Sequence, residues 1–250
     1  MRKKVILVIG ACGSIGQELS LKIAKRYQII LVDKNHKKLI QLKKFFIGID
    51  VMTFAGDVTK GKIIDRLLSL SIKKYSKIDA VVFCAYPKSP KFGVKFENLE
   101  ENSLREDLYS QLGSLIIFCQ KIAKFFLKFK SGNIIFISSI QGVAAPKFDH
   151  YTNLKMTSPI EYSVIKAGII SMTKYLSKYF RKKNINVNCV SPGGIKDGQD
   201  AKFISRYNKS CNSKGLLLPN DIVGSIEFLL SDESKYINGH NIVVDDGWCL

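Results

Sequence analysis

Unbroken apolar runs rich in β-branched residues alternate with longer amphipathic segments along the chain. A run that is apolar at every position is typical of a strand buried on both faces of a parallel sheet. The pattern predicts seven strands: KVILVIG (4–10), QIILVD (28–33), VMTFAGD (51–57), IDAVVFCA (78–85), GNIIFISS (132–139), INVNCVSPG (185–193) and NIVVDDG (241–247). Strands and helices that alternate in this way favour an α/β fold, with a single doubly wound (Rossmann) parallel sheet and helices on both faces. We expect one domain over residues 1–250, with ligands beyond the carboxyl ends of the strands.

Composition and charge narrow the class of protein. The 250 residues are 46% hydrophobic, which suits one globular core. The net charge of +18 comes mostly from lysines spread along the chain, so it indicates a biased genome composition and no nucleic-acid partner. No apolar segment approaches the roughly 20 residues of a membrane span, and the apolar run near the start is too short for a signal peptide. Six cysteines without a C-x-x-C pair predict a reduced, cytoplasmic protein with no metal site.

A glycine-rich turn, GACGSIG, follows the first predicted strand. It places Gly10, Gly13 and Gly16 at the start of a helix, where the backbone can approach a pyrophosphate. The helix N-terminus offers free N–H groups and a positive dipole end to the same anion. We therefore expect a dinucleotide to contact this turn, including the residues between the glycines, which are Cys12, Ser14 and Ile15.

Carboxylates follow the next two predicted strands. Asp33 ends the second strand, where a carboxylate can accept hydrogen bonds from the adenosine ribose hydroxyls. A carboxylate repels a 2′-phosphate, so the sequence favours NAD over NADP, although Lys34 beside it can soften that repulsion. After the third strand, Asp57 and Val58 are expected beside the adenine; a turn formed by the Asp57 side chain is the alternative.

The pattern Tyr-x-x-x-Lys occurs twice, as Tyr151/Lys155 and as Tyr162/Lys166. Residues four apart share one face of a helix, so a helical pair places an ammonium beside a phenol. An ammonium about 4 Å from a phenolate stabilises it by roughly 4 kcal/mol at an effective dielectric of about 20, which lowers the phenol pKa by about three. The Ser-Pro dipeptide at 158–159, as N-cap and first-turn residue, predicts that a helix starts between the two pairs. We expect Tyr162 and Lys166 to carry acid/base chemistry, and Tyr151 to lie in a loop beside the substrate.

These motifs together resemble the short-chain dehydrogenase/reductase family over essentially the whole chain. The matching segments are GACGSIG, GDV, GNIIFISSIQG, YSVIKAG, INVNCVSPGG and INGHNIVVDDG. The resemblance implies an NAD(P)-dependent enzyme in which Tyr162 is the general acid/base, Ser139 hydrogen-bonds the reacting oxygen, and Lys166 binds the nicotinamide ribose. It also implies that three residues back the nicotinamide ring, namely Pro192, Gly193 and Ile195.

The chain departs from the family pattern in four places. The middle glycine of GACGSIG lies one place earlier than in most short members of the family. Where the family has Asn-Asn-Ala-Gly after the fourth strand, this chain has FCAYP, so the cofactor must be lined by Cys84, Ala85 and Tyr86. The helix Asn of the family's proton relay falls on Gln111, with Ser110 as the neighbouring candidate. The sequence does not decide whether this chain has the family's water relay. The loop between Ser139 and Tyr162 is also longer than in the plainest members.

The long loop, CAYP and the segment from SPGGI to Gln199 look like a narrower group, the oxidoreductases of flagellin-modification and legionaminic-type nonulosonic acid gene clusters. That resemblance implies a sugar or amino-sugar substrate of surface glycan synthesis. Two alternatives stay open: a 3-oxoacyl-thioester reductase and a non-catalytic nucleotide-binding regulator. The family also implies a homodimer or homotetramer built through helices near 112–129 and 165–180, whose apolar faces are equally explained by packing on the sheet.

A substrate lid is expected near residues 194–218, after the sixth strand. It carries more basic than acidic residues, namely Lys196, Lys202, Arg206, Lys209 and Lys214 against Asp197 and Asp200. Such a surplus can concentrate an anion and clamp a phosphate, with Arg206 best suited to paired hydrogen bonds. We therefore expect an anionic sugar derivative, phosphorylated or nucleotide-linked, in preference to an acyl thioester.

Overall fold

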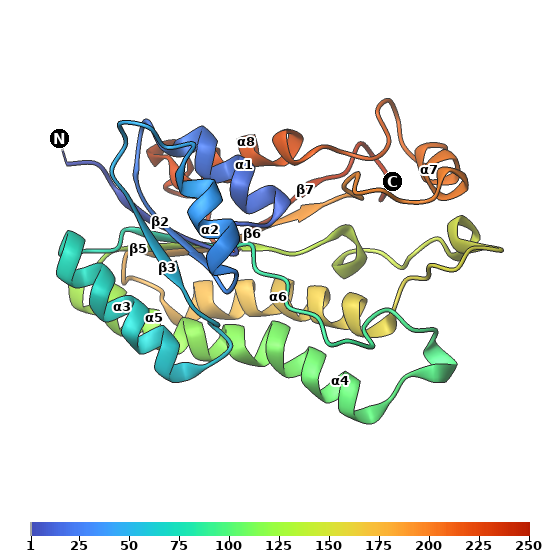
Figure 1. Ribbon diagram of the computed structural model, residues 1–250, viewed down its shortest axis with the longest axis horizontal. Coiled ribbons are helices and arrows are strands. Elements are labelled where there is room, and N and C mark those ends of the chain that lie inside the picture. Colours follow the sequence, from blue (N-terminus) through green and yellow to red (C-terminus); the bar gives the residue numbers. More distant parts are fainter. Residues whose placement is uncertain (1) are drawn as a thin grey trace.

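The computed structural model describes residues 2–250 and has one parallel sheet at its centre (Figure 1). All seven expected strands form: β1 (Val5–Ile9), β2 (Gln28–Asp33), β3 (Val51–Ala55), β4 (Ala80–Phe83), β5 (Gly132–Ile137), β6 (Ile185–Pro192) and β7 (Asn241–Val244). Neighbours are hydrogen-bonded in the order β3-β2-β1-β4-β5-β6-β7, and every pair is parallel. The chain order reverses between β1 and β4, the switch point where open α/β sheets bind ligands. The predicted doubly wound fold is confirmed.

Helices cover both faces of the sheet in two layers (Figure 1). One layer consists of α1 (Ser14–Ile23), α2 (His36–Lys43) and α8 (Pro219–Leu230), and the other of α3 (Gly61–Tyr75), α4 (Glu101–Leu108), α5 (Ser114–Phe129) and α6 (Ile160–Tyr179). Along β1, Leu7 and Ile9 are buried against the second layer, whereas Ile6 and Val8 are buried against the first. This two-sided burial explains why the strands read as unbroken apolar runs. No helix in the described part of the chain has the length and apolar character that crossing a membrane requires.

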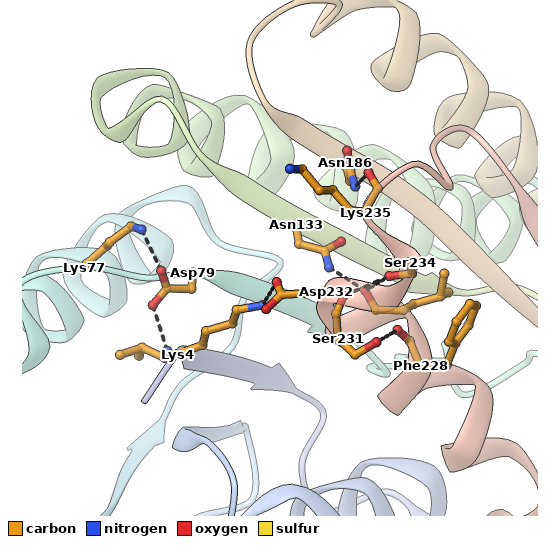
Figure 2. Close-up of polar contacts among 12 residues, drawn as sticks. Lys4, Lys77, Asp79, Asn133, Asn186, Phe228, Ser231, Asp232, Ser234 and Lys235 are labelled. Atoms are coloured by element: carbon orange, nitrogen blue, oxygen red, sulfur yellow. Dashed lines mark hydrogen bonds and ion pairs between the residues drawn. The ribbon is translucent and has the colours of Figure 1, made fainter. Parts of the chain in front are cut away.

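Polar contacts hold the amino ends of the strands (Figure 2). Asp79, just before β4, accepts a bond from the backbone of β1 (2.9 Å) and pairs with Lys77 (2.7 Å). Lys4 pairs with Asp232 (2.6 Å), which follows α8, and the Asn133 amide of β5 donates to the backbone of α8 (2.6 Å). These contacts tie α8 to β1 and β5 at the end of the sheet opposite the glycine-rich turn.

Two segments beyond the carboxyl ends of the strands pack on one another. α7 (Ala201–Asn208) lies within the expected lid, and the long loop before α6 contains a 3-10 helical turn, Phe148–Tyr151. The rings of Phe203 and Tyr151 join the two segments, with centres 5.2 Å apart. The long loop therefore supports the lid.

The helix that carries the second Tyr/Lys pair begins slightly later than the sequence predicts. α6 starts at Ile160, and Pro159 occupies the N-cap position in an extended conformation. The predicted cap by Ser158 is wrong, because its hydroxyl donates to Gln141 Oε1 (2.6 Å). Tyr162 and the lysine four residues later still fall within the first two turns of α6.

Candidate active site

A cavity of about 820 Å³ runs along the carboxyl ends of the strands. Ser139 lines it near its middle, together with both members of the helical Tyr/Lys pair. The lining also includes all the residues expected at the cofactor, namely Gly10, Cys12, Gly13, Ser14, Ile15, Gly16, Asp33, Asp57, Val58, Cys84, Ala85, Tyr86, Tyr162, Lys166, Pro192, Gly193 and Ile195. One continuous space therefore joins the glycine-rich turn to the candidate catalytic groups.

The glycine-rich turn leaves room for a bound group. Gly10 has φ +79°, and a Cβ there would lie 2.6 Å from the Ala85 backbone N. A Cβ on Gly16 would lie 2.2 Å from the Gly10 carbonyl O, so the fold itself requires both glycines. A Cβ on Gly13 would meet only that carbonyl oxygen, at 3.4 Å. The space over Gly13, at the N-cap of α1, fits an anionic group held by free N–H groups.

Asp33 is held rigidly at one end of the cavity. Its Oδ2 accepts a bond from the Cys12 N–H (3.0 Å), and its Oδ1 accepts one from the Asn35 N–H (2.9 Å). Each carboxylate oxygen has a further lone pair, so the side chain can still accept bonds from ribose hydroxyls. Lys34 and Lys38 line the same end of the cavity, so the carboxylate lies among positive charges.

Asp57 forms the turn that was the alternative to an adenine contact. Its Oδ1 accepts bonds from the Thr59 N–H (3.0 Å) and from the Thr59 hydroxyl (2.8 Å). The side chain also lines the cavity, as does Val58. Turn formation and contact with a ligand are therefore compatible at this position.

Tyr162 and Lys166 lie one turn apart on α6. Lys166 Nζ is 5.5 Å from the centre of the Tyr162 ring and donates to the Ile137 carbonyl (3.0 Å). Burial of the ammonium lowers the Lys166 pKa to about 8. An amine with this pKa is charged at neutral pH and loses its proton at mildly alkaline pH.

The pKa of Tyr162 moves in the opposite direction from the one the sequence suggested. Burial raises the pKa of the phenol, and the polar contact with the Ser139 hydroxyl opposes that rise without cancelling it. The expected lowering by Lys166 is wrong for this structure. Both side chains are withdrawn from water, and the ammonium is directed at the Ile137 carbonyl.

The other Tyr/Lys pair does not share a helix. Tyr151 ends the 3-10 helical turn, and Lys155 lies in the loop that follows. Tyr151 lines the cavity, whereas Lys155 is not part of the lining. Tyr151 therefore lies outside the helix, as expected, and lines the cavity, while its contact with the substrate stays a prediction.

Gln111 is the predicted catalytic residue that does not reach the cavity wall. It lies in a π-helical turn, Tyr109–Gly113, which links α4 to α5. Its side chain is buried, and neither amide atom has a hydrogen-bond partner within residues 2–250. Leu112 beside it packs against Gly168 of α6. Gln111 and the neighbouring candidate, Ser110, thus lie behind the lining, in a segment that contacts the catalytic helix.

The part of the cavity beyond Tyr162 has an aromatic side and a polar side. Tyr207 stacks on Trp248, with ring centres 5.9 Å apart and planes at 18°, and its hydroxyl accepts a bond from the Gly194 N–H (2.6 Å). Phe203 extends the aromatic side. Gln141 provides the polar side together with Ser158, whose hydroxyl donates to it. We call this part the substrate end.

Two basic residues of the lid have partners for their side chains within the protein. Arg206 Nη1 donates to the backbone carbonyls of residues 149, 150 and 152, the last at 2.6 Å. Lys214 pairs with Asp221 (2.6 Å). None of the five basic lid residues lines the cavity, so the predicted phosphate clamp in the lid is wrong. Carbonyls in a short helical turn lack helical partners, and the guanidinium satisfies them.

The lining residues that sequence reasoning missed include Lys38, Lys88, Gln141 and Trp248. Gln141 follows Ser139 by two residues and Lys88 follows CAYP directly, so their positions beside motifs were available signals. Trp248 directly follows INGHNIVVDDG, so the same signal was available there. Lys38 lies beside no motif, and only the fold brings it to the cavity.

The fold, the open anion site at a helix N-terminus and the grouping of Ser139, Tyr162 and Lys166 define a dinucleotide-dependent dehydrogenase. The family model described as "Enoyl-(Acyl carrier protein) reductase" matches residues 10–249, and the chain belongs to the short-chain dehydrogenase/reductase family. Post-translational flagellin modification protein A of Campylobacter coli is 42% identical to it over 256 residues, with 100% of both chains covered.

Two further comparisons extend this result. The 3-oxoacyl-[acyl-carrier-protein] reductase FabG of Thermotoga maritima is 28% identical, over 98% of this chain and 97% of the relative. The crystal structure of a short chain dehydrogenase from Leptospira borgpetersenii with bound NAD+ has a TM-score of 0.86 at 28% identity, covering 100% of this chain and 94% of that one. The protein is thus an oxidoreductase of a family that uses NAD or NADP, and the alternative of a non-catalytic regulator is set aside.

Proposed function

We propose that the protein is an NAD-dependent oxidoreductase that transfers a hydride between nicotinamide and a hydroxyl or ketone of a sugar or amino-sugar derivative. The observation that carries the proposal is one cavity in which Ser139, Tyr162 and Lys166 lie between the glycine-rich turn and the substrate end. The full-length similarity to a flagellin modification protein supports a role in flagellin or other surface glycan biosynthesis. The cytoplasm is part of the proposal, and it rests on the free cysteines.

In this proposal the chain's own residues orient the reactants and move the proton. The dinucleotide supplies the hydride chemistry when it is bound. The Tyr162 hydroxyl gives a proton to the substrate oxygen during reduction and takes it back during oxidation, while Ser139 hydrogen-bonds that oxygen. The Lys166 side chain, beside Tyr162 on α6, would hold the nicotinamide ribose through hydrogen bonds from its ammonium. Gln111, whose buried amide atoms have no partner among residues 2–250, would hold a water of the relay that returns the proton to solvent.

The proposed preference for NAD rests on the adenosine end of the cavity. The Asp33 carboxylate, fixed by two backbone N–H groups, accepts bonds from both ribose hydroxyls and repels a 2′-phosphate. Lys34 and Lys38 line the same end of the cavity and reduce this repulsion. Pyrophosphate binds over Gly13, at the N-terminus of α1.

The proposed substrate class rests on the two sides of the substrate end. The apolar C–H face of a sugar ring suits the aromatic side formed by Phe203, Tyr207 and Trp248. The polar side, with Gln141, suits sugar hydroxyls. The aromatic side also accepts an alkyl chain, and the similarity to a 3-oxoacyl reductase keeps an acyl thioester as the competing substrate.

We also propose that the enzyme is a homodimer or homotetramer joined through α5 and α6. The inner faces of both helices pack on the sheet, as expected for apolar helices. Their outer faces nevertheless expose Ile116, Val164, Tyr175 and Tyr179, the last two at 66% and 67%. Large apolar side chains grouped in this way favour a protein partner.

The test is NAD-linked turnover of a substrate panel by wild type, Tyr162→Phe and Tyr151→Phe. The panel holds hexoses, hexosamines, their phosphates and nucleotide-linked forms, and an acetoacetyl thioester, and NADH formation or loss is followed by absorbance. We expect a sugar derivative to have the highest kcat/KM. Tyr162→Phe should lose at least about a hundredfold in kcat and still bind NAD, because only the proton-transfer hydroxyl is removed. Tyr151→Phe should lose far less; the reverse ranking, or preference for the thioester, would contradict the proposal.

A further inference from the structure

One cation lies at the substrate end outside the catalytic set. Among the lysines that line the cavity, Lys34 and Lys38 lie with Asp33 at the adenosine end, and Lys166 lies beside the catalytic tyrosine. The remaining one is Lys88, in the loop between β4 and α4. Because the basic residues of the lid do not line the cavity, Lys88 is the group placed to meet a negative charge on the substrate.

Aromatic rings hold the Lys88 ammonium next to the catalytic tyrosine. Its Nζ lies 4.7 Å from the centre of the Tyr86 ring and 5.7 Å from that of Phe92. The same two rings pack on Tyr162, with centres 5.5 and 6.4 Å from its ring. Attraction to aromatic faces positions an ammonium without neutralising its charge. Among the ion pairs of residues 2–250, no carboxylate pairs with Lys88, so its charge remains available to a ligand.

Hydrogen bonds to α4 and to α6 anchor the loop that carries Lys88, both from residues that follow it in the sequence. The buried Asp107 carboxylate of α4 accepts bonds from the Ser89 N–H (2.8 Å) and from the Ser89 hydroxyl (2.6 Å). Further along the loop, the Gly93 N–H donates a longer bond to the buried Glu161 side chain of α6 (3.4 Å). A loop that is already ordered loses little conformational freedom when a ligand binds, which favours affinity.

Over the residues that the structure describes, the lining of the substrate end carries no carboxylate, because the two that anchor the loop, Asp107 and Glu161, are buried behind it. The acidic residues of the cavity lining are Asp33 and Asp57, and both lie at the adenosine end. A wall without carboxylates that presents one fixed ammonium attracts an anion and offers nothing to pair with a cation. The aromatic side formed by Tyr207 and Trp248 faces the same space.

We propose that Lys88 is the residue that recognises an anionic group, a phosphate or a carboxylate, on the sugar substrate. This inference rests on the proposed function and names the substrate class for that site. In this proposal the positive charge that meets the substrate comes from the β4–α4 loop and not from the lid. A charge-assisted bond from an ammonium is stronger than a neutral one, so the anionic sugar should bind more tightly than its neutral parent.

The test compares wild type with Lys88→Gln and with the matched control Lys91→Gln. Lys91 lies in the same loop, pairs with Glu100 and is not part of the cavity lining. Glucose 6-phosphate, glucuronate and glucose are titrated calorimetrically into the NADH complex in phosphate-free buffer, so that no turnover occurs. Wild type and Lys91→Gln should bind one anionic sugar at least about tenfold more tightly than glucose, about 1.4 kcal/mol, and Lys88→Gln should keep less than about threefold.

The outcomes separate this inference from the proposed function. Preference for glucose 6-phosphate identifies a phosphate ligand and preference for glucuronate a carboxylate, and loss of either in Lys88→Gln alone supports Lys88. If wild type binds glucose as tightly as both anions, or Lys88→Gln keeps the preference, the Lys88 inference is overturned. Tyr162-dependent, NAD-linked turnover of any sugar leaves the proposed function standing in that case. Absence of such turnover across the panel overturns the proposed function whatever the binding results show.

Discussion

The buried ammonium of Lys166 makes the stability of the protein depend on pH in a way that one substitution can isolate. The residue is 7% exposed, and burial lowers its pKa from 10.5 to about 8. Below pH 8 the side chain is charged in both the folded and unfolded chain, and folding carries the desolvation cost. At about 1.36 kcal/mol per pKa unit, that cost is about 3 kcal/mol. Between pH 8 and 10.5 the unfolded chain binds more protons, so the free energy of unfolding rises as the cost disappears.

Lys166→Met keeps a flexible, unbranched side chain, one atom shorter than lysine, and removes the charge. The variant loses the bond to the Ile137 carbonyl, which costs about 1 kcal/mol at every pH. It should therefore be more stable than wild type by about 2 kcal/mol at pH 7. This advantage should shrink by about 3 kcal/mol between pH 8 and 10.5, so that wild type becomes the more stable protein at the alkaline end.

Urea unfolding of both proteins at several pH values from 7 to 10, followed by far-UV circular dichroism without cofactor, measures the difference. Taking the difference between proteins removes the titration of other groups. Lys174→Met is the control, because Lys174 is an exposed lysine on the same helix, and its difference from wild type should be flat. A Lys166→Met difference that stays constant or grows with pH would refute the reasoning.

Three further predictions concern the cofactor and the relay. Gly13→Ala should change the free energy of unfolding by less than about 1 kcal/mol yet weaken NAD binding at least tenfold by calorimetry, whereas Gly10→Ala, at φ +79°, should destabilise the fold itself. Asp33→Ser should narrow or invert the ratio of NAD to NADP affinity; an unchanged ratio would count against the carboxylate. Gln111→Asn should keep most activity and Gln111→Leu should lower kcat about tenfold or more, with equal activity of the Leu variant marking a purely structural residue.

The order of strands and helices and the position of the glycine-rich turn could be predicted from the local sequence pattern. Strands buried on both faces must be apolar throughout, so the seven strands could be predicted from their own residues, without knowledge of the neighbouring strands in the sheet. The glycines at 10 and 16 are dictated by backbone contacts a few residues away or at the adjacent strand end. The choice between Tyr162 and Tyr151 rested on a proline before the helix, which is again a local signal.

Long-range packing decided the rest, because burial and partner choice depend on segments far apart in the chain. The sequence suggested Arg206 as a phosphate ligand. In the folded protein its guanidinium instead donates to backbone carbonyls within residues 149–152. The pKa of Tyr162 rises instead of falling, since desolvation depends on the side chains that enclose it. Lys88 becomes a candidate for the substrate only when its loop is laid against Tyr162, and Trp248 reaches the same cavity from the last residues of the chain. The sequence shows that these charged and aromatic residues are present. Only the tertiary structure determines which of them line the same cavity.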